Sequence, residues 1–165
     1  MKKVTKWLNE KLEVTLCICL MSIMTLAIFL QVIMRYVFNN SLSWSEELAR
    51  YTFIWLIYLG ISYGCQLMKH IKIDASLKLF PKKARKYIVI VGDICFLAFS
   101  IYVVITGGIY AAKTAASGDY SAAMHIPMVY INSAPCVGFA LASIRQIQTI
   151  IYRVNRIRHG EEEDL

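Results

Sequence analysis

Long stretches without any charge constrain this chain more than any other feature. Residues 14–34 contain no Asp, Glu, Lys or Arg, and this run is long enough for a helix to cross a bilayer. Three further stretches are strongly apolar, at about 51–68, 87–112 and 120–144. We therefore expect an all-α integral membrane protein with four transmembrane helices in a single membrane domain that covers residues 1–165.

The basic residues predict how these helices are oriented. Of the 18 Lys and Arg residues, 15 lie in an N-terminal segment (1–13), a loop (69–86) and a tail (145–165). The remaining three are Arg35, Arg50 and Lys113. Because basic residues gather on the cytoplasmic side of membrane proteins, we expect both termini, the loop and the tail to be cytoplasmic. The basic residues form no face of the kind that binds nucleic acid, so no nucleic acid partner is expected.

A helix start is predicted after the polar segment 39–43. Ser43 and Glu46 have the spacing of a capping box, which places the first helical residue at Trp44. Two alternatives stay open for residues 44–50. They form either a short interfacial helix or the direct start of the second span.

The charged residues of this helix start have two readings. Glu46 and Arg50 have i,i+4 spacing, and Glu46 and Glu47 suit the positive end of a helix dipole. A solvated helix face explains all three and is favoured by the sequence alone. The functional alternative is a docking surface for an extracytoplasmic partner.

Few ionisable residues lie inside the predicted spans. Asp93 is an intramembrane charge of uncertain role, about two turns from the cytoplasmic end of its span. A carboxylate paired with Lys86 or with a partner helix is favoured over an ion pathway, since no pathway is evident. For His125, near the outer end of the fourth span, a structural role is favoured over a proton relay.

Small residues and prolines predict where helices pack and bend. Gly60 and Gly64 form a GxxxG motif in the second span, and Gly138 is a small residue in the fourth. Pro135 should kink the fourth span, because it cannot donate a backbone hydrogen bond. Pro81 should interrupt any helix in the basic loop.

Nothing in the sequence predicts enzymatic chemistry. The five cysteines lie in apolar runs without a CxxC pair, so we interpret them as small buried hydrophobes. No nucleophile–base pair, phosphate-binding loop or metal-ligand spacing is present. We expect no catalytic residues, no metal site and no cofactor.

Two segments resemble the small membrane subunit of tripartite ATP-independent periplasmic (TRAP) transporters, the DctQ-like family. The first runs from Gln31 to Leu56 and includes the string Ser-Trp-Ser-Glu-Glu-Leu-Ala-Arg-Tyr that ends at Tyr51. The second, residues 121–128, contains the His-Ile-Pro sequence that ends at Pro127 and is followed by Pro135 and Gly138. The resemblance covers about residues 12–148.

The resemblance implies a scaffold role in the bacterial inner membrane, among phospholipids. In this family a much larger, sodium-coupled elevator subunit carries the substrate, an organic acid such as a C4-dicarboxylate or sialic acid. Sodium is expected to bind that subunit, and a periplasmic binding protein delivers the substrate. The resemblance places six residues at a periplasmic partner interface: Arg35, Trp44, Glu46, Glu47, Arg50 and Tyr51.

Two alternatives without this partner stay open. A homo-oligomeric small multidrug/proton antiporter needs an acid deep in its first span, and residues 14–34 contain none. The other alternative is a membrane assembly factor of another family, and the resemblance is the single observation that speaks against it.

Overall fold

A computed structural model describes residues 2–66 and 82–158 of the chain, and the side chains of 12–65 and 88–155. Its helices are α1 (Lys2–Tyr36), α2 (Ser43–Gln66), α4 (Lys82–Ser117), α5 (Val129–Asn132) and α6 (Ala134–Arg158). Most of the predicted cytoplasmic loop, including Pro81, and residues 159–165 of the predicted tail lie outside the described residues.

The second helix settles one open alternative. α2 is unbroken from Ser43 to Gln66, so residues 44–50 continue directly into the long helix and do not form a separate interfacial helix. The helix begins one residue before the predicted start at Trp44. At this end the Ser45 hydroxyl is fully buried and donates a hydrogen bond to the Leu42 carbonyl oxygen at 2.8 Å.

The predicted start of the fourth span, at residue 120, is wrong. Residues 118–128 form a compact outer loop without helix: Gly118 has a φ of 67°, and residues 120 and 127 form an antiparallel bridge. Helical structure starts at Val129. Pro135 was expected to kink the fourth span, and the helix is interrupted at Ser133, between α5 and α6. Pro135 lies in the first turn of α6, where its missing backbone N–H is tolerated.

Among the described residues, three stretches have the length and composition to cross a membrane. They are Leu12–Tyr36, Ile88–Ser117 and Val129–Asn155. α2 is not among them. These stretches support a membrane protein, and the crossing of α2 stays a prediction.

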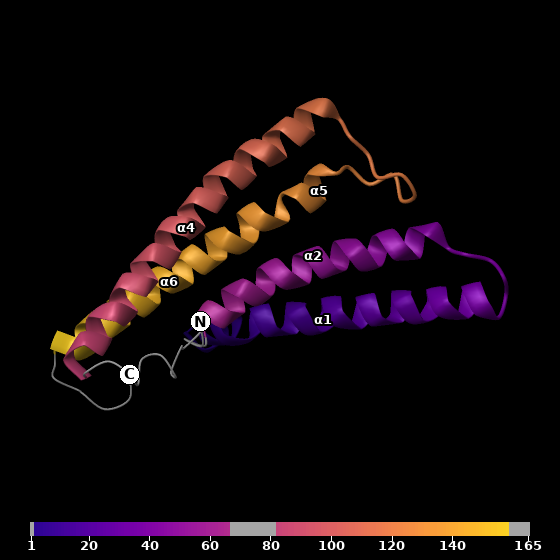
Figure 1. The fold of residues 1–165 in the computed structure, drawn as a ribbon. Helices are drawn as coiled ribbons and strands as arrows, with labels where there is room; N and C mark the ends of the chain where they lie inside the picture. The colour runs from indigo at the N-terminus through magenta and orange to yellow at the C-terminus, as the bar shows by residue number, and fades with distance from the viewer. Residues whose placement is uncertain (1, 67–81, 159–165) are drawn as a thin grey trace.

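The long helices form two antiparallel hairpins, α1 with α2 and α4 with α6 (Figure 1). α2 packs against α6, so the helices lie in the order α1, α2, α6, α4, with α1 and α4 at the edges. We call the end with the starts of α1 and α4 the inner end. The opposite end, with residues 37–42 and the outer loop, is the outer end. The hairpins converge at the inner end and separate toward the outer end (Figure 1).

Small and polar side chains fill the contacts between the helices. The buried residues include Ala49, Ser62, Ala134 and Ala142, whereas large aliphatic and aromatic side chains are exposed along the edges. Small residues let helix backbones approach closely, which is how helices associate where lipid removes the hydrophobic drive. An apolar exterior of this extent needs lipid or a protein partner to cover it.

Candidate functional site

The first turns of α2 present an exposed ion pair at the outer end. An Arg50 guanidinium nitrogen lies 3.2 Å from a Glu46 carboxylate oxygen, and the two side chains are 62% and 58% exposed. Trp44, two residues before Glu46, is also exposed. An ion pair this exposed contributes little to stability, so these side chains are available to a partner.

Two other residues of the predicted partner interface contact the chain itself. The Tyr51 hydroxyl donates a hydrogen bond to the Met128 sulfur at 3.8 Å. A guanidinium nitrogen of Arg35, which is exposed, lies 3.5 Å from the Ser41 hydroxyl. The structure thus pairs Glu46 with Arg50 on an open surface, leaves Trp44 exposed on another side of the same helix and turns Tyr51 inward.

Glu47 connects the two hairpins at the outer end, where they separate. Its carboxylate accepts hydrogen bonds from the Ser121 hydroxyl and from the Met124 backbone N–H, the latter at 3.0 Å. Ser121 is nearly fully buried. Glu47 therefore holds the outer loop against the start of α2, a contact that sequence reasoning missed. The sequence signal for this contact is the Ser-x-x-Met turn at residues 121–124, because its backbone N–H groups need a hydrogen-bond acceptor.

These hydrogen bonds lower the pKa of Glu47, the Ser121 hydroxyl contributing most. A carboxyl with a lowered pKa stabilises the contact above its ordinary pKa, and this stabilisation is lost as pH falls through the lowered value.

We expect Glu47→Gln to speed hydrogen exchange of the Met124 amide at neutral pH, after correction for intrinsic rates, and to remove the acceleration that acid causes in the wild type. Glu46→Gln, the matched control, should change neither. Equal exchange in all three chains would contradict the contact.

Asp93 has a partner within the chain. Its carboxylate forms an ion pair with Arg153 of α6 and accepts a hydrogen bond from the Gln146 amide nitrogen at 2.9 Å. Both charged side chains are nearly buried, at 12% and 13% exposure. The prediction of a paired carboxylate had named Lys86 or a partner helix, and the observed cation instead comes from the residues assigned to the tail.

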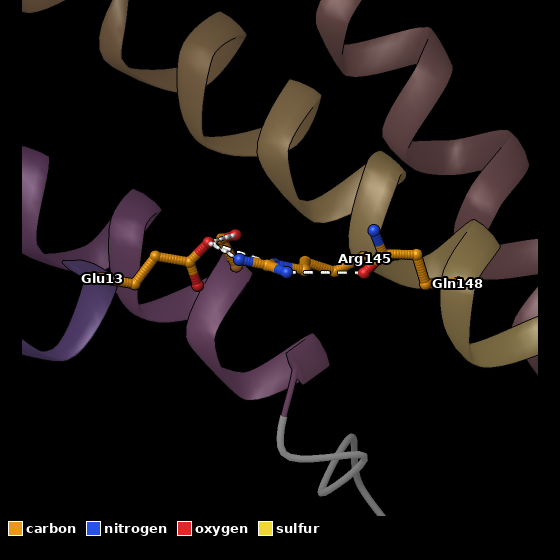
Figure 2. Close-up of polar contacts among 4 residues, drawn as sticks. Glu13, Arg145 and Gln148 are labelled. Carbon is orange, nitrogen blue, oxygen red and sulfur yellow. Dashed lines mark hydrogen bonds and ion pairs between the residues drawn. The ribbon is translucent and has the colours of Figure 1, made fainter. Parts of the chain in front are cut away.

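A second ion pair lies at the inner end, between α1 and α6 (Figure 2). Two guanidinium nitrogens of Arg145 lie 3.3 Å from one carboxylate oxygen of Glu13, which also accepts a hydrogen bond from the Ser62 hydroxyl of α2 at 3.1 Å. Another Arg145 nitrogen lies 3.4 Å from the Gln148 amide oxygen. Glu13 is 5% exposed and Arg145 12%. One cluster therefore joins three helices.

Sequence reasoning missed this cluster, although a signal was present. Glu13 immediately precedes the first uncharged stretch, and Arg145 immediately follows the fourth. Opposite charges at the same predicted membrane depth and on the same side are candidates for pairing. The sequence does not give the rotation of each helix about its own axis, and this rotation decides which side chains face each other.

The predicted packing residues differ in their surroundings. A Cβ added at Gly138 would lie 2.5 Å from the Tyr58 Cβ and 2.8 Å from the Tyr58 carbonyl oxygen, so α2 and α6 cross closely there. A Cβ at Gly60 would meet nothing within 4 Å. Pro127 lies in the outer loop and Pro135 in the first turn of α6. Gly64 lies near the end of α2 and is half-buried.

The remaining candidates define no reactive centre. Cys65 is buried, whereas Cys19 and Cys95 are exposed on α1 and α4, which differs from the predicted burial of all five cysteines. His125 lies in the outer loop with a φ of 54° and is exposed. Within residues 2–66 and 82–158, no group of three or more His, Cys, Asp or Glu side chains could hold a metal ion.

The fold and these contacts define a polytopic helical membrane protein with internal polar braces. The chain belongs to the DctQ component family of tripartite ATP-independent periplasmic transporters, whose sequence pattern matches residues 24–156.

Its relatives carry TRAP names. It is 36% identical, over 59% of this chain and 42% of the relative, to the C4-dicarboxylate TRAP transporter small permease protein DctQ of Vibrio cholerae. It is 31% identical, over 65% of each chain, to a putative TRAP transporter small permease protein of Haemophilus influenzae. It is 39% identical, over 53% of this chain and 13% of the relative, to the sialic acid TRAP transporter permease protein SiaT of H. influenzae. The matches thus span less than two thirds of the length of each of these relatives.

Proposed function

We propose that this chain is the small scaffold subunit of a TRAP secondary transporter in a bacterial inner membrane. The observation that carries the proposal is the family match over residues 24–156. Two features of the fold support it. The chain is braced internally by buried ion pairs, which suits a static support, and its long edge helices expose apolar faces that suit lipid and a membrane partner.

The partner in this proposal is a larger, sodium-coupled permease subunit that moves the substrate. The match to a short part of the much longer SiaT permease supports a close association between such a segment and a permease. Sodium would bind the larger subunit. The substrate would be an organic acid such as a C4-dicarboxylate or sialic acid, which the names of these two relatives contain.

In this proposal all four long helices cross the membrane, and both termini are cytoplasmic. α2 lies between α1 and α6, two helices with membrane-spanning character, and is antiparallel to α1. A helix held between two spans shares their depth. Basic residues at the inner end favour the cytoplasm for that end.

The outer end would then face the periplasm and help to dock the substrate-binding protein. The exposed Trp44, Glu46 and Arg50 support this part of the proposal, because they combine an aromatic anchor with an accessible charge pair. Glu47 and Tyr51 would act indirectly, since they hold the outer loop beside that surface.

The proposal is tested by purifying the tagged chain in mild detergent after co-expression with the TRAP permease of its own organism. We expect the permease to co-purify at a fixed ratio, and uptake of the organic acid into vesicles to require both chains. A chain that purifies alone, in vesicles whose uptake does not depend on it, would contradict the proposal.

A further inference from the structure

The two edge helices expose different kinds of surface. Along the uncharged part of α1 the exposed large side chains are hydrocarbon or thioether, among them Met21, Leu26 and Phe29. The hydroxyls of Ser22 and Thr25 donate to carbonyl oxygens of their own helix, at 2.9 Å and 2.8 Å. The other polar side chains of this stretch include the exposed thiol of Cys19, a weak donor, and the half-buried amide of Gln31, which lies near the outer end of α1. Near the middle of α1 the exposed hydroxyls thus have acceptors in their own helix, a composition that lipid tails accept.

The free face of α4 carries an exposed tyrosine near its middle. Tyr102 is 65% exposed. It lies in the uncharged stretch between Asp93 and Lys113. With the α-helical rise per residue, its Cα is about 14 Å along the axis from Asp93 and about 16 Å from Lys113. The hydrocarbon layer is about 30 Å thick, so Tyr102 lies near its centre, too deep for its hydroxyl to reach either headgroup region.

The position of the Tyr102 hydroxyl distinguishes it from the other exposed tyrosines of the described chain. These lie toward the helix ends or in the outer loop: Tyr36, Tyr110, Tyr120, Tyr130 and Tyr152. At similar depth on α2, Tyr58 is half-buried and packs on Phe139, with ring centroids 6.0 Å apart.

A hydroxyl placed in hydrocarbon without an acceptor is unfavourable. The side chain of Tyr102 has no hydrogen-bond partner among the described residues. The next hydroxyl along α4, that of Thr106, donates to the Tyr102 carbonyl oxygen at 2.9 Å and forms no hydrogen bond with the Tyr102 hydroxyl within the described part of the chain. Lipid tails offer no acceptor either, so the Tyr102 hydroxyl calls for a polar group from another protein.

We propose that the exposed face of α4 around Tyr102 is the surface on which the large permease subunit packs, and that a transmembrane helix of the permease supplies the acceptor for the Tyr102 hydroxyl. The exposed face of α1 then borders lipid. This inference rests on the proposed function, since it takes the permease as the partner. The inference adds which of the two edge helices, α1 or α4, forms the interface with the permease. Tyrosine, with a flat ring and one polar end, is a typical anchor of such interfaces.

Photo-crosslinking tests the choice of edge. The photoreactive residue p-benzoylphenylalanine is placed at position 102, or at position 29 on the exposed face of α1 as the matched control, in the chain co-expressed with the permease. We expect cross-links to the permease from position 102 and none from position 29. Permease cross-links from 29 and not from 102 would overturn the assignment of the α4 face.

Tyr102→Phe tests the hydroxyl, because it keeps the ring. We expect it to reduce the amount of permease retained after detergent washing by roughly three-fold, the size typical of an interhelical hydrogen bond in a membrane. Phe29→Leu on α1 should leave retention unchanged. Unchanged retention with Tyr102→Phe would overturn the acceptor assignment. If the wild-type chain itself retains no permease, the proposed function fails; if it retains the permease but position 102 does not cross-link, only the present inference fails.

Discussion

Replacing Glu13 with Ala will destabilise the folded chain by about 3–5 kcal/mol, the cost of removing one member of a buried ion pair. Arg145 is only 12% exposed and would lose the carboxylate that two of its nitrogens contact at 3.3 Å. Ser62 would lose its acceptor at the same time. The free energy of unfolding, measured by titrating SDS into mixed micelles of the purified chain, checks this expectation.

The exposed pair at the outer end supplies the control. Glu46→Ala breaks an ion pair of nearly the same length, but both of its side chains are more than half exposed, so we expect a loss of at most about 1 kcal/mol. Equal losses for Glu13→Ala and Glu46→Ala would show that burial does not strengthen the Glu13 contact.

A double replacement separates the pair from its cavity. Glu13→Leu combined with Arg145→Met removes both charges and restores apolar volume, so most of the loss should be recovered. A double variant as unstable as Glu13→Ala would contradict the explanation by loss of the carboxylate beside a buried guanidinium. In that case Glu13 would matter through packing against its neighbours.

The helices themselves could be predicted because their cause is local in the sequence. Uncharged stretches, the capping spacing at Ser43 and the distribution of basic residues each depend on neighbours along the chain. The outer loop could not, since residues 120–128 carry no Asp, Glu, Lys or Arg and so continue the fourth uncharged stretch. Their conformation depends on Gly118 and on a carboxylate 74 residues away in sequence, that of Glu47.

The polar contacts were predictable in kind but not in partner. Asp93 was expected to be paired, yet Arg153 had been assigned to the cytoplasmic tail, and Glu13 and Arg145 are 132 residues apart. Which charges meet depends on the crossing of α2 and α6 and on the rotation of each helix. The crossing of α2 and α6 includes a close backbone approach that a single glycine permits.

Gly138 is that glycine, and replacing it with Ala is expected to destabilise the chain by about 1–3 kcal/mol, the usual cost of overpacking. The added methyl group would lie 2.8 Å from the Tyr58 carbonyl oxygen and 2.9 Å from the carbonyl carbon. These are backbone atoms of a helix, so they cannot move aside as a flexible side chain would. α2 and α6 must separate instead.

Gly60→Ala is the matched control for the Gly138 variant, because its methyl group would meet nothing within 4 Å in the chain. The gain in helix propensity should make it neutral or slightly stabilising in the isolated chain.

Separation of α2 from α6 should also weaken the cluster that Ser62, Glu13 and Arg145 form across these helices. Gly138→Ala and Glu13→Ala are therefore expected to be less than additive in a double-mutant cycle of unfolding free energies. Strict additivity would mean that the helix crossing and the buried ion pair stabilise the fold independently.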